Sequence, residues 1–368
     1  MKFAVEKQDL LSGLTVAQSV ISTRTNLPVL SNVLISADAE EIKLIATDLD
    51  IGVKVVVPAK VDSGGGISIN SRKLFDFVKE IDADRIEFVV KKNYHVHITA
   101  GSAVARFYGL PEEEFPSLPS VKEKSRIEIP SDVLSNLIDL TIFAASRDSS
   151  RYELNGILFE LEPNLIRTVA SDGRRLSLVE TDISHDLNQK FILPLKAGQE
   201  LSRFLPESSV ISVSSDESVV SFSWENVELV SRIIEGEYPQ YRQVIPEEKD
   251  EKAIIDAGAF LSALKRAHIF VSTDSFAVRL DFYKNKLVIS KDSQEIGSSR
   301  EELSIVYPGE DITIGVNPEF LIDMLKTVPI DTIRMELIAP DRPMVIRDVL
   351  EIDGIGYRYM YLVSPMRI

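Results

Sequence analysis

The feature that most constrains this chain is an internal repeat of about 123 residues. Three segments share one pattern, in which apolar alternation is followed by a short polar turn and more alternation, and this pattern predicts a β-hairpin. The segments lie at residues 32–48, 155–172 and 278–292. The same spacing separates Phe115-Pro116 from Tyr238-Pro239. A period that recurs three times predicts three copies of one domain.

Each repeat contains a second, shorter period of about 64 residues. Apolar residues at helical spacing open each half, and strands follow each helix. Six helices are predicted, at residues 7–21, 71–81, 131–145, 195–205, 257–269 and 318–328. The predicted fold class is α+β, with three pseudo-repeated domains that each pack two helices on antiparallel sheets. Charged, proline-bearing stretches place the domains at residues 1–122, 123–247 and 248–368.

Composition excludes several classes of protein. Cysteine is absent and histidine occurs four times, so disulfides and thiolate nucleophiles are excluded and little material remains for a metal centre. The longest uncharged run, Leu10 to Thr23, is shorter than the ~20 residues of a membrane helix. The opening residues 1–7 are charged and lack the apolar core of a secretory signal. We expect a soluble cytoplasmic protein without a membrane segment.

The net charge of −16 also argues against a conventional nucleic-acid-binding protein. Such proteins gain affinity when Lys and Arg neutralise phosphates, so they usually carry the opposite balance.

Candidate catalytic groups are few. Asp48, Asp172 and Asp292 occupy equivalent ends of the three predicted hairpins. They could offer carboxylates to Mg²⁺, but a repeated Asp at a strand end more often caps backbone N–H groups. His95 and His97 share one face of a strand, and no third metal ligand accompanies them. No Gly-x-Ser-x-Gly motif occurs, so we expect no catalytic residues, metal or cofactor.

Two features are not explained by packing. Residues 171–176 form an extension that only the middle repeat carries, and the chain ends on the apolar segment 359–368. We expect residues 359–363 to form a docked last strand. For residues 365–368, two interpretations stay open: packing against the domain, or formation of a pocket.

Ordered motifs run through the whole chain: Met1-Lys2-Phe3, Leu27-Pro28-Val29-Leu30-Ser31-Asn32, Ala46-Thr47-Asp48-Leu49, Tyr152-Glu153-Leu154-Asn155-Gly156, Ala170-Ser171-Asp172-Gly173-Arg174-Arg175-Leu176, Tyr238-Pro239-Gln240-Tyr241 and Pro365-Met366-Arg367-Ile368. In these motifs the chain resembles the bacterial sliding clamps, the beta subunits of DNA polymerase III. The resemblance implies a non-enzymatic processivity factor. It also implies a ring of two chains, joined head to tail, that encircles duplex DNA.

The negative net charge does not argue against a ring, because a ring holds DNA by encircling it and does not need strong affinity for phosphates. The six predicted helices carry nine basic and eight acidic residues, whereas the other 292 residues carry a net charge of −17. Candidate DNA-facing groups on or near the helices, whose phosphate contacts would be independent of base sequence, are Arg24, Arg72, Lys73, Lys196, Arg203, Lys265, Arg266 and Lys326. The resemblance adds Tyr152 and again indicates Arg24 as DNA contacts.

The resemblance further implies a partner-peptide pocket and a ring interface. The pocket would comprise Leu154, Ser171, Gly173, Arg174, Arg175, Leu176, Pro239, Val244, Phe320, Val363, Ser364, Pro365, Met366, Arg367 and Ile368. It would accept a short peptide bearing Gln and then Leu or Phe. At the interface, Phe107 would meet Ile269 and Phe270 of the neighbouring copy. Implied partners are the polymerase III alpha subunit, the clamp loader, other polymerases, ligase and mismatch-repair proteins.

Two alternative functions belong to other classes of protein. One is an interaction scaffold that never encircles DNA. The other is a hydrolase whose carboxylates are Asp48, Asp172 and Asp292.

Overall fold

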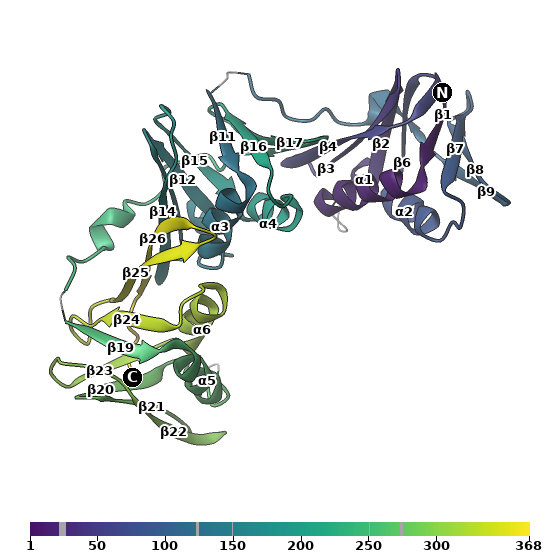
Figure 1. Cartoon of the computed structure of the whole chain (residues 1–368). Helices are drawn as coiled ribbons and strands as arrows, with labels where there is room; N and C mark the ends of the chain where they lie inside the picture. Colours follow the sequence, from purple (N-terminus) through teal and green to yellow (C-terminus); the bar gives the residue numbers. More distant parts are fainter. Residues whose placement is uncertain (22–26, 123–124, 149, 250, 273–274) are drawn as a thin grey trace. The chain divides into compact units, whose positions relative to one another are not determined.

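The computed structural model describes residues 1–368 apart from 22–26, 123–124, 149, 250 and 273–274. These residues form two compact units. The N-terminal unit comprises residues 1–132 and 203–233, and the C-terminal unit comprises residues 133–202 and 234–368. Each unit contains two antiparallel sheets (Figure 1). Among the described residues, no helix has both the length and the apolar character that crossing a membrane requires.

The N-terminal unit contains a five-stranded and a nine-stranded sheet. The first has the order β5-β1-β7-β8-β9, with bounds Lys60–Ser63, Lys2–Glu6, Arg85–Val90, His95–Ala100 and Ala103–Tyr108. The second has the order β10-β6-β2-β3-β4-β18-β17-β16-β11, with bounds Leu110–Pro111, Gly65–Asn70, Asn32–Asp38, Glu41–Thr47, Ile51–Pro58, Val227–Arg232, Val219–Trp224, Val210–Ser215 and Ser125–Pro130. Because β4 pairs with β18, this sheet joins the first third of the chain to the middle third.

The C-terminal unit repeats this plan with an eight-stranded and a four-stranded sheet. The first has the order β15-β12-β13-β14-β26-β25-β24-β19, with bounds Gln189–Pro194, Gly156–Glu162, Leu165–Ser171, Arg175–Asp182, Ile355–Val363, Met344–Ile352, Thr332–Glu336 and Lys252–Asp256. The second has the order β22-β21-β20-β23, with bounds Gly297–Ser304, Lys286–Ser293, Val278–Tyr283 and Ile312–Val316. Here β14 pairs with β26, so the last strand of the chain completes a sheet begun in the middle third.

Six α-helices lie in the described residues, at the predicted places. They are α1 (Lys7–Val20), α2 (Ser71–Lys79), α3 (Ser131–Ile142), α4 (Leu195–Phe204), α5 (Ala257–His268) and α6 (Pro318–Thr327). Figure 1 shows α1 beside α2 and α5 beside α6, and both pairs are in contact. Side-chain caps fix three of the starts: Asn70, Asp256 and Asn317 accept backbone N–H groups of α2, α5 and α6. The predicted α+β class, with two helices per repeat, is confirmed.

Two glycines allow helices to approach their neighbours closely. A Cβ atom on Gly13 of α1 would lie 2.7 Å from Leu44 Cδ1, so α1 rests directly on β3. A Cβ atom on Gly198 of α4 would lie 3.0 Å from Ile142 Cδ1 of α3. Each helix therefore packs at a distance that a larger side chain would increase.

The three predicted hairpins are β2–β3, β12–β13 and β20–β21. Each turn holds one non-glycine residue with a positive φ: Ala39 at 50°, Asn164 at 61° and Asn285 at 59°. The equivalence predicted for the three aspartates is wrong at Asp292. Because β21 continues to Ser293, Asp292 lies inside that strand opposite Ser298 and not at its end.

The last strand, β26, confirms the prediction of a docked strand over residues 359–363. Tyr357, Tyr359 and Tyr361 alternate along it and are almost fully buried. Tyr361 donates its hydroxyl hydrogen to the carbonyl oxygen of Phe320 at 2.7 Å. This strand anchors the end of the chain in the C-terminal unit.

Candidate functional site

A cavity of about 330 Å³ opens in the C-terminal unit where three segments meet. They are the turn between β13 and β14, the segment 238–245, which we call the central strap, and the end of β26. Nine residues of the predicted pocket line this cavity: Leu154, Ser171, Gly173, Arg174, Arg175, Leu176, Pro239, Val244 and Ser364. We call this cavity the apolar pocket.

The turn at residues 171–175 lies within the extension at 171–176 that was predicted to be specific to the middle repeat. Asp172 Oδ1 accepts the backbone N–H groups of Arg174 and Arg175 at 2.8 and 3.0 Å. Gly173 has a φ of 82° and donates its N–H to Ser171 Oγ at 3.0 Å. A non-glycine residue rarely adopts this backbone conformation. Asp172 therefore caps the turn, as expected of a strand-end aspartate.

Arg175 connects this turn to α6. Its Nε donates to Asp172 Oδ2 at 3.1 Å and its Nη1 to Asp323 Oδ2 at 2.8 Å. The guanidinium carbon lies 4.7 Å from the ring centre of Phe320, which is cation–π distance. Phe320 therefore contacts Arg175 but is not part of the cavity lining.

The floor of the apolar pocket belongs to a buried cluster that spans β12, β13, β14 and β26. Leu176 and Leu362 are members of it, with Tyr241 from the central strap. Burial raises the pKa of Tyr241 to about 12, and its hydroxyl donates to Glu160 Oε2 at 2.6 Å. Burial also raises the pKa of Tyr238, which lines the same pocket. Apolar walls with few polar groups suit a short hydrophobic side chain.

Leu362 lines the apolar pocket in the place expected for Val363. Successive side chains of a strand point to opposite faces, so only one of these two neighbours can face the cavity. Arg175 pairs with Val363 and Leu176 with Leu362, and this register decides which residue faces the cavity.

The terminal residues 365–368 also lie outside this lining. Ser364 donates its N–H to the carbonyl oxygen of Arg174, and Met366 donates to that of Gly315, both at 2.8 Å. Arg367 and Ile368 are exposed. Pro365, Met366, Arg367 and Ile368 thus run from the rim of the apolar pocket to β23.

Six residues that line the apolar pocket were not predicted from the sequence: Arg151, Tyr238, Gln240, Tyr241, Pro343 and Leu362. The repeated aromatic-Pro pair was a signal for Tyr238, and its position beside Pro239 could have placed it here. Pro343 and Leu362 gave no local signal, because they reach the pocket only through strand pairing across the sheet.

The described basic residues that were predicted to face DNA belong to α2, α4, α5 and α6. In the N-terminal unit, Arg72 pairs with Asp76, Lys73 is exposed, and Arg203 stacks on Phe204 at 5.0 Å. Arg24 lies outside the described residues.

In the C-terminal unit, Lys196 is half-buried, and Lys265 and Lys326 are exposed. Arg266 pairs with Glu301 at 2.5 Å. Tyr152 is 57% exposed. Lys73, Lys265 and Lys326 form no ion pair with any described residue, which leaves their ammonium groups available to phosphates.

The residues predicted for the ring interface lie at sheet edges or next to them. Phe107 belongs to β9, the edge of the five-stranded sheet, and packs edge-on against Phe77 at 5.8 Å. Ile269 follows α5 and is 67% exposed. Phe270 lies against Gly297, where β22, the edge of the four-stranded sheet, begins.

The remaining residues that were considered for catalysis or metal binding make structural contacts. Asp48 Oδ1 accepts the backbone N–H groups of Asp50 and Ile51 at 3.1 and 2.8 Å. His95 packs edge-on against Tyr108 at 4.9 Å. Within the described ranges, no three His, Asp or Glu side chains are grouped so that they could hold a metal ion.

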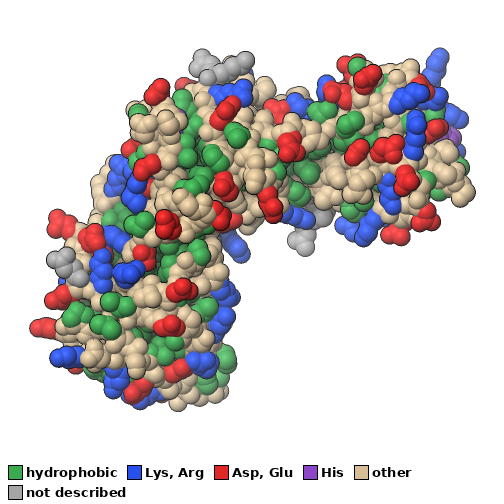
Figure 2. All heavy atoms as spheres, viewed as in Figure 1, with side chains coloured by type: hydrophobic (Ala, Val, Ile, Leu, Met, Phe, Trp, Pro, Cys, Tyr) green, Lys and Arg blue, Asp and Glu red, His purple; other side chains and the backbone are tan. Residues whose placement is uncertain are grey.

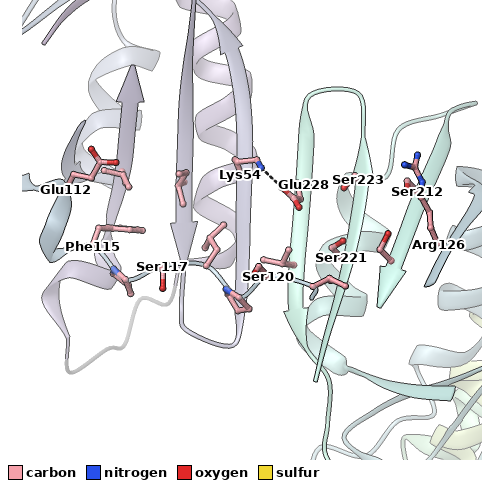
Figure 3. A pocket seen from close by; sticks show the side chains of 18 residues that line it. Lys54, Glu112, Phe115, Ser117, Ser120, Arg126, Ser212, Ser221, Ser223 and Glu228 are labelled. Atoms are coloured by element: carbon pink, nitrogen blue, oxygen red, sulfur yellow. Dashed lines mark ion pairs between the residues drawn. The ribbon is translucent and has the colours of Figure 1, made fainter. Parts of the chain in front are cut away.

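The N-terminal unit holds a different cavity, of about 750 Å³ (Figure 3). Residues 115–121, which we call the first strap, cover it. Ser212 pairs with Ser223 and Ser214 with Ser221 across β16 and β17, and all four line the cavity. Their hydroxyls make no hydrogen bond within the described part of the chain. Lys54 and Glu228 form an ion pair beside them, as the dashed line in Figure 3 marks. We call this space the serine cavity.

Comparison with known proteins gives one consistent result. Three family models match in succession: the N-terminal domain of the DNA polymerase III beta subunit over residues 1–119, its central domain over 128–240 and its C-terminal domain over 242–362. The beta sliding clamp of Chlamydia muridarum is 29% identical, covering 100% of this chain and 99% of the relative.

Solved structures agree. The DNA polymerase sliding clamp of Bacillus subtilis is 28% identical, with a TM-score of 0.93 over 100% of this chain and 99% of that one. The sliding clamp of Bartonella birtlesii, solved bound to griselimycin, is 28% identical, with a TM-score of 0.93 over 100% of both chains.

Proposed function

The chain belongs to the DNA polymerase III beta subunit family, the bacterial sliding clamps, and from that premise we propose that two copies close head to tail into a ring around duplex DNA. It acts as a processivity factor that holds a DNA polymerase on its template. The observation that carries this function is the succession of three family domains along one chain. The proposed domain boundaries are 1–122, 123–247 and 248–368.

The proposed ring closes where β9 of one copy meets β22 of the other. Both strands are sheet edges, and an edge strand presents unpaired N–H and C=O groups to a new strand. Arg106 on β9 and Glu301 and Glu302 on β22 supply opposite charges. Phe107, Ile269 and Phe270 would form the apolar part of the same contact. Two such contacts related by a two-fold axis close a ring.

We propose that Arg24, Arg72, Lys73, Tyr152, Lys196, Arg203, Lys265, Arg266 and Lys326 face the enclosed DNA. Lys73, Lys265 and Lys326, which form no ion pair with a described residue, are best suited to contact phosphates without regard to base sequence. Weak individual contacts suit a ring that slides, because topology already prevents dissociation. The net charge of −16 is then compatible with DNA binding and limits adhesion elsewhere on DNA.

The apolar pocket is the proposed docking site for partner peptides. Its lining, together with Phe320, Val363 and residues 365–368 nearby, would accept a peptide with Gln followed by Leu or Phe. Because most binding energy comes from a few buried anchors, one pocket can serve several partners in turn. These would be the polymerase III alpha subunit, the clamp loader, other polymerases, ligase and mismatch-repair proteins.

We further propose that the protein is non-catalytic and works in the cytoplasm. Asp48 and Asp172 cap turns, and Asp292 lies within a strand. This arrangement disfavours the carboxylate hydrolase. The scaffold alternative is not favoured either, because the chain matches sliding clamps over its full length.

A primer-extension assay tests the proposal. The reaction contains the cognate polymerase, the clamp loader and a long primed circular template. We expect the DNA products to be several-fold longer when this protein is added than when it is left out. Val244→Asp places a carboxylate at the rim of the apolar pocket. Because Val244 is 55% exposed, the fold tolerates the change. We expect this variant to lose the lengthening, and products of equal length with and without the wild-type chain would contradict the proposal.

A further inference from the structure

The central strap is held on the sheet beside it by paired charges. Arg242 donates to Glu160 Oε2 at 3.0 Å and to Glu162 Oε1 at 3.2 Å. Just beyond the strap, Arg347 Nη2 donates to the carbonyl oxygen of Pro246 at 2.7 Å. Figure 2 shows basic and acidic side chains interspersed along the side of the C-terminal unit where the central strap runs (Figure 1). The strap is therefore fixed by ion pairs and hydrogen bonds as well as by apolar contacts.

Glu160 makes the contact that reaches the apolar pocket. It belongs to β12, and its side chain is 17% exposed. Glu160 Oε2 accepts the hydroxyl hydrogen of Tyr241 at 2.6 Å, and the same oxygen accepts Arg167 Nη1 at 2.7 Å. Tyr241 is buried and lines the apolar pocket. One carboxylate oxygen thus fixes a residue of the pocket lining through its hydroxyl.

This hydrogen bond is of the stronger kind. Burial opposes ionisation of Glu160, but the hydrogen bonds from Tyr241 and Arg167 hold its pKa below the usual range. A hydrogen bond to an ionised acceptor is about twice as strong as one between neutral groups. A buried hydroxyl that loses its acceptor also incurs a cost. Tyr241 therefore has one strongly preferred position in the folded protein.

The N-terminal unit provides an internal comparison, because the first strap crosses an equivalent sheet. Leu118 of the first strap lies 123 positions before Tyr241 and has no hydroxyl. By the pairing of β2 with β3 and of β12 with β13, Ser36 occupies the place of Glu160. A strap can thus be held on its sheet without a contact between a carboxylate and a hydroxyl. That contact accompanies the unit that contains the apolar pocket.

We propose that Glu160 is a positioning residue for peptide docking. By holding the hydroxyl of Tyr241, it keeps the ring of Tyr241, and with it the strap wall of the apolar pocket, in the geometry that a peptide meets. A peptide then binds without having to immobilise the Tyr241 side chain, which would otherwise lower its affinity. This inference rests on the proposed function of the apolar pocket.

A fluorescein-labelled synthetic peptide, Gly-Gln-Ala-Ser-Leu-Phe, tests the inference, and we call it the anchor peptide. Glu160→Leu removes the acceptor, and Tyr241→Phe removes the hydroxyl but keeps the ring. By fluorescence anisotropy, we expect each variant to bind the anchor peptide roughly 3- to 10-fold more weakly, because binding must now order one aromatic side chain. We expect the double variant to bind no more weakly than either single variant, because both changes remove the same contact.

Glu180→Leu is the matched control. Glu180 accepts Arg167 Nε at 2.5 Å and Arg358 Nε at 3.1 Å, and among the described residues its carboxylate bonds to no part of the central strap. This variant also takes a carboxylate from Arg167, yet we expect its peptide affinity to equal that of the wild type. In the free proteins, amide hydrogen exchange over residues 238–245 is expected to be faster in Glu160→Leu and unchanged in Glu180→Leu.

Wild-type affinity in Tyr241→Phe would overturn the inference and leave the apolar pocket intact as a docking site. This variant leaves every charge in place, so it decides the question even if Glu160→Leu does not fold. Losses that add up in the double variant, or an equal loss in Glu180→Leu, would also overturn the inference. If the wild type does not bind the anchor peptide, the docking function of the apolar pocket itself fails.

Discussion

At the scale of single residues, Gly173 limits the shape of the apolar pocket. Its φ is 82°, and a Cβ atom there would lie 1.9 Å from Arg151 Nη1, which donates to the carbonyl oxygen of Asp172. We expect Gly173→Ala to cost about 1–2 kcal/mol of unfolding free energy from the backbone alone. The substitution also displaces Arg151, so we expect a lower affinity for a peptide that carries Gln followed by Leu or Phe. Denaturant unfolding and anisotropy measure the two effects.

Gly354 supplies the matched control for that change. Its φ is 79°, yet nothing lies within 4 Å of a Cβ built on it. Gly354→Ala is expected to show a similar backbone cost with unchanged peptide affinity. Equal peptide affinity for both variants would contradict the role given to Gly173.

The sequence predicted most of the pocket lining but not all of it. The extension at 171–176 stood out because only one repeat carries it, and local hydrogen bonds of Asp172 build that turn. The choice between Leu362 and Val363 depends on the pairing of β26 with β14, which is distant in sequence. The prediction misplaced Asp292 because β21 is longer than β3 and β13, the equivalent strands of the first two repeats. Local patterns predict turns, whereas long-range register decides which side chain faces a cavity.

At the scale of elements, the first strap is held at identifiable points. A Cβ atom on Gly52 would lie 2.4 Å from Leu118 Cδ2, so Leu118 fills the space above Gly52. Further along the chain, Lys122 donates its N–H to Asp216 Oδ2 at 2.8 Å, and Ser218 and Val219 donate to Oδ1. The Leu118 contact and the Asp216 carboxylate, which binds Lys122 just beyond the strap, therefore help to hold this segment in place.

Asp216 makes the stability of the N-terminal unit sensitive to acid. Burial opposes ionisation, but the backbone hydrogen bonds from Lys122, Ser218 and Val219 hold the pKa of Asp216 below its usual 3.8. A carboxyl with a lowered pKa stabilises the fold above its unfolded pKa, and this contribution is lost as pH falls through the folded value.

We therefore expect Asp216→Asn to cost about 1–2 kcal/mol at pH 7 and progressively less below pH 3.8. Urea unfolding of both proteins from pH 7 to pH 2 measures the difference. A cost that stays constant over this range would contradict the assignment.

The terminal segment 365–368 is a separate element with its own prediction. Met366 pairs with Gly315, and Ser364 with Arg174 at the rim of the apolar pocket. We expect deletion of residues 365–368 to abolish binding of an anchor peptide while the dimer persists, because β26 ends before the deletion. Anisotropy and native mass report the two properties. Undiminished peptide affinity would exclude the segment from the binding site.

At the scale of the whole molecule, the proposed dimer depends on apolar residues at or beside sheet edges. We expect Ile269→Asp to lower the native mass from twice 41.1 kDa to 41.1 kDa, because a charge buried in an interface is costly. Val210→Asp is the control, since Val210 is 57% exposed on β16 and lies on neither edge. A dimeric Ile269→Asp variant would refute this interface.

The threefold repeat predicted the architecture well because each copy carries its own hairpin and helix patterns. It did not predict that β4 pairs with β18 and β14 with β26, so that sheets continue from one third of the chain to the next. No local pattern specifies which strand lies beside an edge. Ring closure is likewise not predicted by any local pattern, because it needs a second copy of the chain.

The most direct test of the central claim uses a nicked circular plasmid. The protein is assembled on the circle with a loader of demonstrated activity, and the plasmid is then cut once. We predict that the protein stays on the circle and is released on linearisation, because its link to DNA is topological. Retention on the linear DNA would contradict encirclement and would require direct adhesion by a chain with a net charge of −16.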